Sequence, residues 1–294
     1  MAVIDNAGQS VEIQAMSFTV ATFYHFVPLA DAAALQPLWK KLLVENGVTG
    51  TILLTPEGVN ATIAGSEAGV STVLATLRAD PRLAAMPHKV SVSGVNPFPR
   101  TKVKLKRETI PLGVAINPAR AGEYVKPEHW NALIADPSVV VVDARNAYEV
   151  DIGRFERAQN PNTRTFKELP EWLDANLTDK DTPVAMYCTG GIRCEKSTAY
   201  LKERGFSNVY HLEGGILKYL EDVPEAESLW RGACYVFDDR VALNHDLSPA
   251  LEYQVCRSCN AAVNAGDVRR VNNIGICPVC AAQSQPELAA EHSL

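Results

Sequence analysis

The sequence predicts an α/β protein in three parts: an α+β domain, a domain built on a parallel sheet, and a small tail with four cysteines. From residue 18 to residue 107 the predicted order is strand, helix, strand, strand, helix, strand. From 126 to 220 buried apolar strands alternate with amphipathic helices, which is typical of a parallel sheet covered on both faces. Two C-x-x-C pairs follow. We therefore expect domains at residues 1–110, 111–222 and 223–294.

The composition fits a folded protein and excludes some classes of function. With 294 residues, 47% of them hydrophobic, the chain has room for two domains and a small appendage. Charged residues make up 21%, and the formal net charge is -6. A molecule of this charge has no general attraction for nucleic acid, so DNA binding is not expected, and any RNA contact must use a local basic patch.

No targeting or membrane segment is predicted. The N-terminal stretch MAVIDNAGQSVEIQAM is acidic and polar, whereas a signal peptide needs a basic region followed by an apolar one. The longest apolar runs, such as Val139–Val142, are far shorter than the roughly 20 residues of a membrane helix. We expect a soluble cytoplasmic protein, in which the seven cysteines are metal ligands, catalytic thiols or core residues rather than disulfides.

The elements of the N-terminal domain follow from the period of its apolar residues. Asp31 is a plausible N-cap of the first helix and Gly47 its stop, and Ser66 opens the second helix. The order is that of a ferredoxin-like (acylphosphatase-like) split βαβ unit. The predicted strands are 18–29, a pair in 49–65 around a PEG turn, 89–94 and 101–108, and the helices are 31–47 and 66–80.

The second domain has short apolar strands between longer helices. The segment 97–124 is rich in Pro, Gly and basic residues, and we interpret most of it as a connection. The strands expected after it are 139–144, 183–188 and 209–212, and the helices are 127–136, 165–176, 193–205 and 213–222.

The stretch YCTGGIRCEKSTAYL, residues 187–201, places a cysteine between a strand and a helix. Gly190 and Gly191 allow a sharp reversal in which successive amide N–H groups converge above a helix N-terminus. That positive end and the nearby Arg193 would lower the pKa of Cys188 and favour a thiolate or persulfide. We interpret Cys188 as a nucleophile, because ligands and nucleophiles in such sheets lie at the carboxyl ends of strands. The alternative is a cysteine that merely ends a buried strand.

Other thiols and imidazoles carry weaker signals. Cys194 either resolves an oxidised or persulfidated Cys188 as a disulfide or only packs the helix against the sheet, and spacing does not decide between the two. Cys234 is expected in the core. His25 and His211 have no partner at ligand spacing, so we expect them to be structural.

A basic ridge is predicted in RTKVKLKRE. Its cations alternate with Thr and apolar residues, so the period of a strand puts the cations on one face. Such a ridge can follow RNA phosphates; the alternative is a solvated edge strand that uses lysine against aggregation. The cations are Arg100, Lys102, Lys104 and Lys106.

The tail has the ligand pattern of a zinc site. Cys256–Cys259 and Cys277–Cys280 are C-x-x-C pairs separated by seventeen residues, and the segment between them can form strands. A closed four-thiolate site leaves no open coordination position, so we expect structural zinc rather than catalytic metal. Disulfides or an iron–sulfur ligand set are the alternatives.

The thiol stretch resembles a known family. Cys188, Thr189, Gly190, Gly191, Ile192 and Arg193 match the rhodanese loop Cys-x-x-Gly-x-Arg, in which the cysteine carries a persulfide held by backbone amides. The stretch VVVVDARNAYEVDIGRFERAQNP looks like the rhodanese strand with Asp143, Arg145 and Glu149, and VYHLEGGI looks like the last strand and its Gly-Gly turn. The resemblance implies a rhodanese-like parallel-sheet domain.

Further motifs narrow the resemblance. CTGGIRCEK, PEGVNATIAG, VKLKRE and WRGACYVFDDRVAL together resemble the oxygen-dependent tRNA uridine hydroxylase family, which makes 5-hydroxyuridine at the wobble position. The resemblance implies oxygen as co-substrate, tRNA through its anticodon loop as partner, and Cys188 as catalytic residue. The sequence contains no dinucleotide fingerprint and no convincing 2-His-1-carboxylate cluster, so the redox cofactor is unknown.

Two other functions stay open from the residues alone. The first is a sulfurtransferase that moves sulfur from thiosulfate or a persulfide to RNA or protein. The second is a non-catalytic scaffold, against which the presence of Cys188 and its glycines argues. A free-standing small-molecule sulfurtransferase would need neither the basic ridge nor the cysteine tail.

Overall fold

The computed structural model describes residues 2–4, 10–12 and 17–284. The chain divides into two compact units, residues 1–109 and 110–294. Within the described ranges, no helix is both long and apolar enough to cross a membrane. At the start of the first unit a short antiparallel pair is formed by β1 (Ala2–Ile4) and β2 (Ser10–Glu12).

The first unit is built on a five-stranded sheet of order β6-β3-β5-β4-β7. Neighbouring strands are antiparallel except β4 and β7, which are parallel. The predicted ferredoxin-like order of elements is confirmed, and the strand predicted at 101–108 forms β7, the fifth strand of the sheet. The strands are β3 (Phe18–Phe26), β4 (Thr49–Thr55), β5 (Gly58–Gly65), β6 (Lys89–Ser93) and β7 (Thr101–Leu105).

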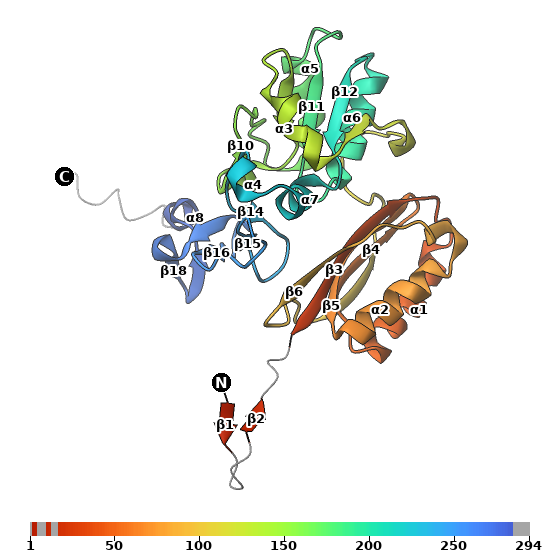
Figure 1. The fold of residues 1–294 in the computed structure, drawn as a ribbon, viewed down its shortest axis with the longest axis vertical. Helices are drawn as coiled ribbons and strands as arrows, with labels where there is room; N and C mark the ends of the chain where they lie inside the picture. The colour runs from red at the N-terminus through yellow and green to blue at the C-terminus, as the bar shows by residue number, and fades with distance from the viewer. Residues whose placement is uncertain (1, 5–9, 13–16, 285–294) are drawn as a thin grey trace, which may run out of the picture. The chain divides into compact units, whose positions relative to one another are not determined.

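Helices α1 (Ala32–Glu45) and α2 (Glu67–Arg78) cover one face of this sheet (Figure 1). Ser66 caps α2 as predicted, because its Oγ accepts the Gly69 N–H at 3.1 Å. Asp31 precedes α1 as predicted, but its side chain caps nothing. The carboxylate instead accepts hydrogen bonds from Arg82, which follows α2, at 2.6 and 3.0 Å.

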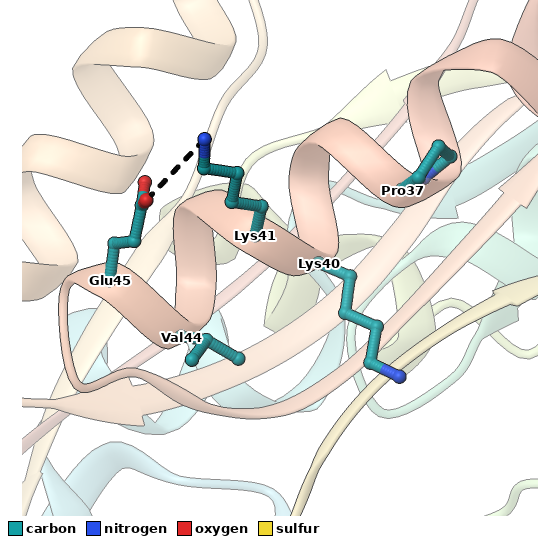
Figure 2. A pocket seen from close by; sticks show the side chains of 5 residues that line it. All are labelled: Pro37, Lys40, Lys41, Val44 and Glu45. Atoms are coloured by element: carbon teal, nitrogen blue, oxygen red, sulfur yellow. Dashed lines mark ion pairs between the residues drawn. The ribbon is translucent and has the colours of Figure 1, made fainter.

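The outer side of α1 has a shallow surface hollow (Figure 2), lined by Pro37, Lys40, Lys41, Val44 and Glu45. Its one ion pair joins Lys41 Nζ and Glu45 Oε1 at 3.6 Å, and both side chains are exposed. Such a pair is worth little in stability. The hollow belongs to a single helix and contains none of the site residues that the sequence predicts.

The second unit contains a four-stranded parallel sheet of order β8-β12-β11-β9. The interpretation of most of 97–124 as a connection leaves out one short strand at its end. Residues Glu123–Val125 form the edge strand β8, which is too short to show a period and is held by pairing with β12. The other strands are β9 (Val140–Asp143), β11 (Val184–Tyr187) and β12 (Val209–Leu212).

Helices cover both faces of the parallel sheet, as the apolar strands predicted. One core lies under α5 and α6 and contains Met186 and Cys188, and the other lies under α3 and α7 and contains Tyr187. Successive residues of β11 therefore point into opposite cores. The helices are α3 (Pro127–Ala135), α4 (Ala147–Val150), α5 (Leu169–Asn176), α6 (Ile192–Glu203) and α7 (Gly215–Asp222).

The C-terminal segment begins against the parallel-sheet domain. Strand β13 (Trp230–Gly232) pairs with β10 (Gly153–Phe155), and the buried Trp230 ring packs 5.2 Å from Phe155. A hairpin of β14 (Cys234–Tyr235) and β15 (Ala242–Leu243) follows. The cysteine region then contains β16 (Tyr253–Val255), β17 (Ala262–Asn264), β18 (Arg269–Val271), β19 (Ile274–Ile276) and α8 (Pro278–Gln283).

Candidate active site and metal centre

The thiol loop occupies the turn between β11 and α6. Cys188 follows the last residue of the strand, and Gly191 precedes the helix with φ of 101°, a conformation that glycine adopts without strain. The Gly191 N–H donates to Cys188 Sγ at 3.1 Å. Cys188 is fully buried, and Gly190 is the one residue of 188–194 that is not buried. A Cβ at Gly190 would meet nothing within 4 Å, so the loop has open space on this side.

The surroundings of Cys188 stabilise the thiolate. Burial alone raises the pKa of Cys188, but the Cys194 thiol, the Arg193 charge and the backbone N–H groups of both residues lower the pKa from 9.0 to about 5. Burial and the neighbouring Cys188 raise the pKa of Cys194 well above its ordinary value. Cys194 is therefore the protonated partner and Cys188 the anion at neutral pH.

A buried ion pair fixes the loop from the side. Arg193 donates to both carboxylate oxygens of Glu149, at 2.6 and 2.7 Å, and its second amino group lies 3.3 Å from Thr189 Oγ1. Both partners are at most 5% exposed. Removing one partner of such a pair typically costs about 3–5 kcal/mol, because the other charge stays buried. The positive charge of Arg193 thus stabilises the Cys188 thiolate, and Glu149 fixes the position of the Arg193 guanidinium.

A second buried ion pair supports the neighbouring strand end. Arg145 binds Asp143 at 2.6 and 2.9 Å and donates to the Gly153 carbonyl at 2.6 Å, and all its side-chain surface is buried. Its guanidinium also lies 5.1 Å from the Trp230 ring centroid. The motif residues Asp143 and Arg145 are thus structural here, holding β10 and β13 beside the site.

The Gly214–Gly215 turn packs directly against the thiol loop. Gly215 has φ of 67°, and a Cβ there would lie 2.4 Å from the Cys188 carbonyl oxygen. The next two amides, of Ile216 and Leu217, donate to the Cys188 and Thr189 carbonyls at 3.0 and 3.1 Å. Only glycine allows this close approach, so the VYHLEGGI stretch is part of the site's support.

The lowered pKa of Cys188 makes both the free energy of unfolding and the thiolate absorbance depend on pH. Because the pKa of Cys188 is lowered in the folded protein, its contribution to the free energy of unfolding is full above pH 9 and disappears as the pH falls to about 5. We expect the ultraviolet absorbance of the thiolate to titrate with a midpoint near pH 5. The same titration of Cys188→Ser supplies the baseline. A midpoint near pH 9 in the difference curve would contradict the assignment.

The four tail cysteines converge on one point. Their Sγ atoms all lie within 4.8 Å of one another, and those of Cys259 and Cys277 are 3.9 Å apart. A zinc ion with Zn–S bonds of about 2.3 Å separates its sulfur ligands by roughly 3.8 Å. Backbone N–H groups of Cys277 and Cys280 donate to the sulfurs of Cys256 and Cys277 at 3.2 and 3.3 Å, which favours thiolates. The donor set fits a four-thiolate metal ion.

Other predicted residues lie apart from the thiol. Cys234 is buried in the core, as predicted. His211 is buried against Tyr124, with ring centroids 4.2 Å apart, and burial lowers its pKa to about 4. His25 lies on β3 in the first unit. Neither histidine joins a group of three or more metal-ligating side chains among the described residues, and their structural role stays a prediction.

Only two of the four cations of the predicted basic ridge lie within a strand. Lys102 and Lys104 lie in β7 with exposed side chains on either side of the buried Val103, as predicted. Arg100 and Lys106 lie just outside the strand. The expectation that the apolar residues are buried fails at Leu105, which is 44% exposed because the strand ends there.

Sequence reasoning missed a group of three aromatic rings beside the thiol loop, formed by Phe237, Tyr235 and Tyr148. The Phe237 ring centroid lies 5.8 Å from the Arg193 guanidinium carbon and 5.1 Å from the Tyr235 ring. Tyr235 in turn packs on Tyr148 at 5.3 Å, next to Glu149 in α4. The only signal in the sequence was the motif WRGACYVFDDRVAL, which does not reveal that these rings meet the thiol loop.

Comparison with known families identifies the domains. Residues 18–109 match the model of a UPF0176 acylphosphatase like domain, and residues 126–222 match the model of a rhodanese-like domain. The fold and the complete thiol loop thus define a rhodanese-domain protein with an acylphosphatase-like domain before it.

Curated relatives narrow this class to one family. A protein of Rhizobium etli is 52% identical over 254 residues, which covers 85% of this chain and 82% of the relative. Proteins of Agrobacterium fabrum and Acaryochloris marina are 51% and 52% identical, covering 90% of this chain and 85% and 86% of their own lengths. All three are named tRNA uridine(34) hydroxylase, and the chain belongs to this family.

Proposed function

We propose that this protein hydroxylates the wobble uridine of tRNA at carbon 5 in an oxygen-dependent reaction, with Cys188 as the catalytic thiolate. The observation that carries the proposal is the intact thiol loop, in which Gly191 donates to Cys188 Sγ at 3.1 Å and Arg193 supplies a positive charge. It occurs in a chain half identical to relatives named for this activity. The wobble uridine is unpaired in the anticodon loop, so exposing its base costs little.

Different domains carry out the chemistry and the binding of tRNA. Residues 111–222 carry the chemistry, while residues 1–110 and 223–294 hold tRNA in the cytoplasm. Zinc bound by Cys256, Cys259, Cys277 and Cys280 shapes the tail, because a closed four-thiolate site offers no position for a substrate. Oxygen chemistry normally uses a metal or an organic cofactor, and oxygen is the co-substrate here.

The helix-free face of the first sheet is the proposed RNA surface of residues 1–110. Strand register places Lys102 beside Thr51, and Lys104 beside Leu53. On the far side of Leu53 the register continues through Asn60 to Tyr24. Tyr24 has an aromatic ring of the kind on which unpaired bases stack. The two lysines make no ion pair among the described residues, so a polyanion would relieve their mutual repulsion. Arg100 and Lys106 extend this basic edge.

Charge reversal tests this surface. We expect Lys102→Glu with Lys104→Glu to weaken tRNA binding by about tenfold or more at low salt and to reduce the salt dependence of binding, because phosphate contacts are lost. Both side chains are exposed, so the melting temperature should be unchanged. Lys40→Glu with Lys41→Glu, on the outer side of α1, is the matched control. Equal affinities of the two double variants would contradict the proposed surface.

The function itself is tested by nucleoside mass spectrometry of unmodified tRNA incubated with the purified protein, in air and without oxygen. The expected result is a gain of one oxygen atom on uridine in air only. The alternative function is sulfur transfer, which the thiol loop would also support through a Cys188 persulfide. Replacement of a uridine oxygen by sulfur when thiosulfate is supplied, with no oxygen gain, would overturn the hydroxylase proposal in favour of that alternative.

A further inference from the structure

The thiol loop lacks an evident holder for the base that would react there. Cys188 is fully buried, and its immediate surroundings are backbone amides, Cys194 and the Glu149–Arg193 pair. None of these groups offers a flat apolar surface. An unpaired base is usually held by stacking on an aromatic side chain. Such a side chain must contact the loop and be exposed before the substrate binds.

Phe237 meets these conditions. Its side chain is 61% exposed, although its neighbours Tyr235 and Val236 are buried. Its ring lies over the Arg193 guanidinium, with 5.8 Å from the guanidinium carbon to the ring centroid. The Tyr235 ring contacts it edge-on at 5.1 Å with an angle of 74° between the ring planes. One part of the Phe237 ring is therefore held by the thiol loop and by Tyr235, and the rest faces solvent.

The turn that presents Phe237 is held by a backbone hydrogen bond and a buried ion pair. The β14–β15 hairpin is closed by the Val236 N–H, which donates to the Val241 carbonyl at 2.9 Å. Beyond it, Arg240 donates to both carboxylate oxygens of Asp238 at 2.9 and 2.6 Å, and both side chains are at most 6% exposed. An exposed aromatic ring on a fixed turn is pre-organised for binding, because little conformational entropy is lost when a ligand arrives.

We propose that Phe237 is the stacking platform for the pyrimidine base that enters the thiol loop of this protein. The inference rests on the proposed function for the identity of that base, the wobble uridine of an RNA anticodon loop. The base stacks on the exposed part of the ring, and Arg193 on the other side strengthens the stack by its positive charge. Phe237 is then a binding and positioning residue, and Cys188 remains the reacting group.

A double-mutant cycle between the protein and the RNA tests the contact. The probes are two anticodon stem-loop RNAs, one with uridine and one with an abasic nucleotide at position 34, and dissociation constants are measured without oxygen. Phe237→Ala should raise the dissociation constant of the uridine RNA by roughly tenfold or more and leave that of the abasic RNA nearly unchanged. Phe237→Tyr should restore binding of the uridine RNA.

Two controls separate stacking from structural damage. Leu38→Ala, in the control helix α1, removes another apolar side chain that is 61% exposed and should change neither constant. The thiolate absorbance of Cys188 should be the same in Phe237→Ala and the wild type if the loop is intact. Equal effects of Phe237→Ala on both RNAs, or no effect on either, would overturn the inference. Failure of the proposed function is seen separately, as the absence of hydroxylated uridine with the wild-type protein.

Discussion

Replacement of Cys188 by alanine is expected to abolish uridine hydroxylation, with a loss of at least about a thousandfold, as is common when a nucleophile is removed. The variant keeps the backbone of the loop but removes the sulfur to which Gly191 donates and towards which the Arg193 charge is directed. Hydroxylated uridine, measured by nucleoside mass spectrometry, should fall to the level seen without protein.

Cys234→Ala is the matched control for this variant, because Cys234 is also a fully buried thiol but lies in the core away from the loop. It is expected to lose some stability and to retain activity within a few-fold. Circular dichroism and melting curves of both variants establish that they are folded. A folded Cys188→Ala protein that still hydroxylates tRNA would end the proposed role of this thiol.

Intact-protein mass spectrometry of the same proteins addresses the chemical state of the thiol. The Cys188 sulfur accepts a hydrogen bond from the Gly191 N–H, and the backbone N–H groups of Arg193 and Cys194 also favour its anionic form, which suits a thiolate or a persulfide anion. A mass increase of one sulfur that is absent from Cys188→Ala would identify a persulfide. Burial and the neighbouring Cys188 keep the Cys194 thiol protonated, and since the thiolate is the attacking form, Cys194 is a hydrogen-bonding partner of Cys188 rather than a nucleophile towards such a species.

The parts of the fold with strong local signals could be predicted from the sequence. Periodicity located β11, α6 and the helices around them, and the spacing of Cys256, Cys259, Cys277 and Cys280 predicted that these four residues come together. The Cys-x-x-Gly-x-Arg pattern placed Cys188 at the end of a strand. In each case the information lies within about twenty-five residues of chain.

The features that could not be predicted depend on pairing between distant short segments. Strand β8 has three residues and exists because it pairs with β12. Glu149 and Arg193 are 44 positions apart, and no local pattern sets their bidentate geometry. Phe237 reaches the loop only because β13 pairs with β10 and the next hairpin folds back over α4. Long-range contacts of this kind leave no periodic trace in the sequence.

The same hairpin links the four-cysteine cluster to the thiol loop. The Tyr235 hydroxyl donates to the Asn260 carbonyl at 2.8 Å, directly after the first cysteine pair. Tyr253 and Val255 of β16 pack against the cluster that contains Tyr235. A metal ion that fixes the cysteine region therefore also fixes the residue next to Phe237. The tail is predicted to contribute to substrate binding without taking part in the chemistry.

Removal of the metal is therefore expected to unfold the tail and to weaken RNA binding. Apparent binding free energies of structural zinc in small domains are about 10–16 kcal/mol, and the small cluster around the four cysteines has little else to hold it. Treatment with a strong chelator, or Cys259→Ser, should open residues 250–284 to limited proteolysis and raise the dissociation constant for an anticodon stem-loop several-fold. The parallel-sheet core should stay protected, because it does not depend on the metal.

The neighbouring Ser258→Ala variant is the control for Cys259→Ser, since Ser258 lies in the same knuckle with an exposed side chain and is not among the converging ligands. It should retain about one zinc per chain by elemental analysis and the wild-type proteolysis pattern. Readdition of zinc should restore protection to the chelated wild type but not to Cys259→Ser. A metal-free protein with an unchanged proteolysis pattern would show that the four thiols hold the tail by packing alone. In that case the hairpin carrying Tyr235 and Phe237 would owe its position to the β10–β13 pairing rather than to the metal.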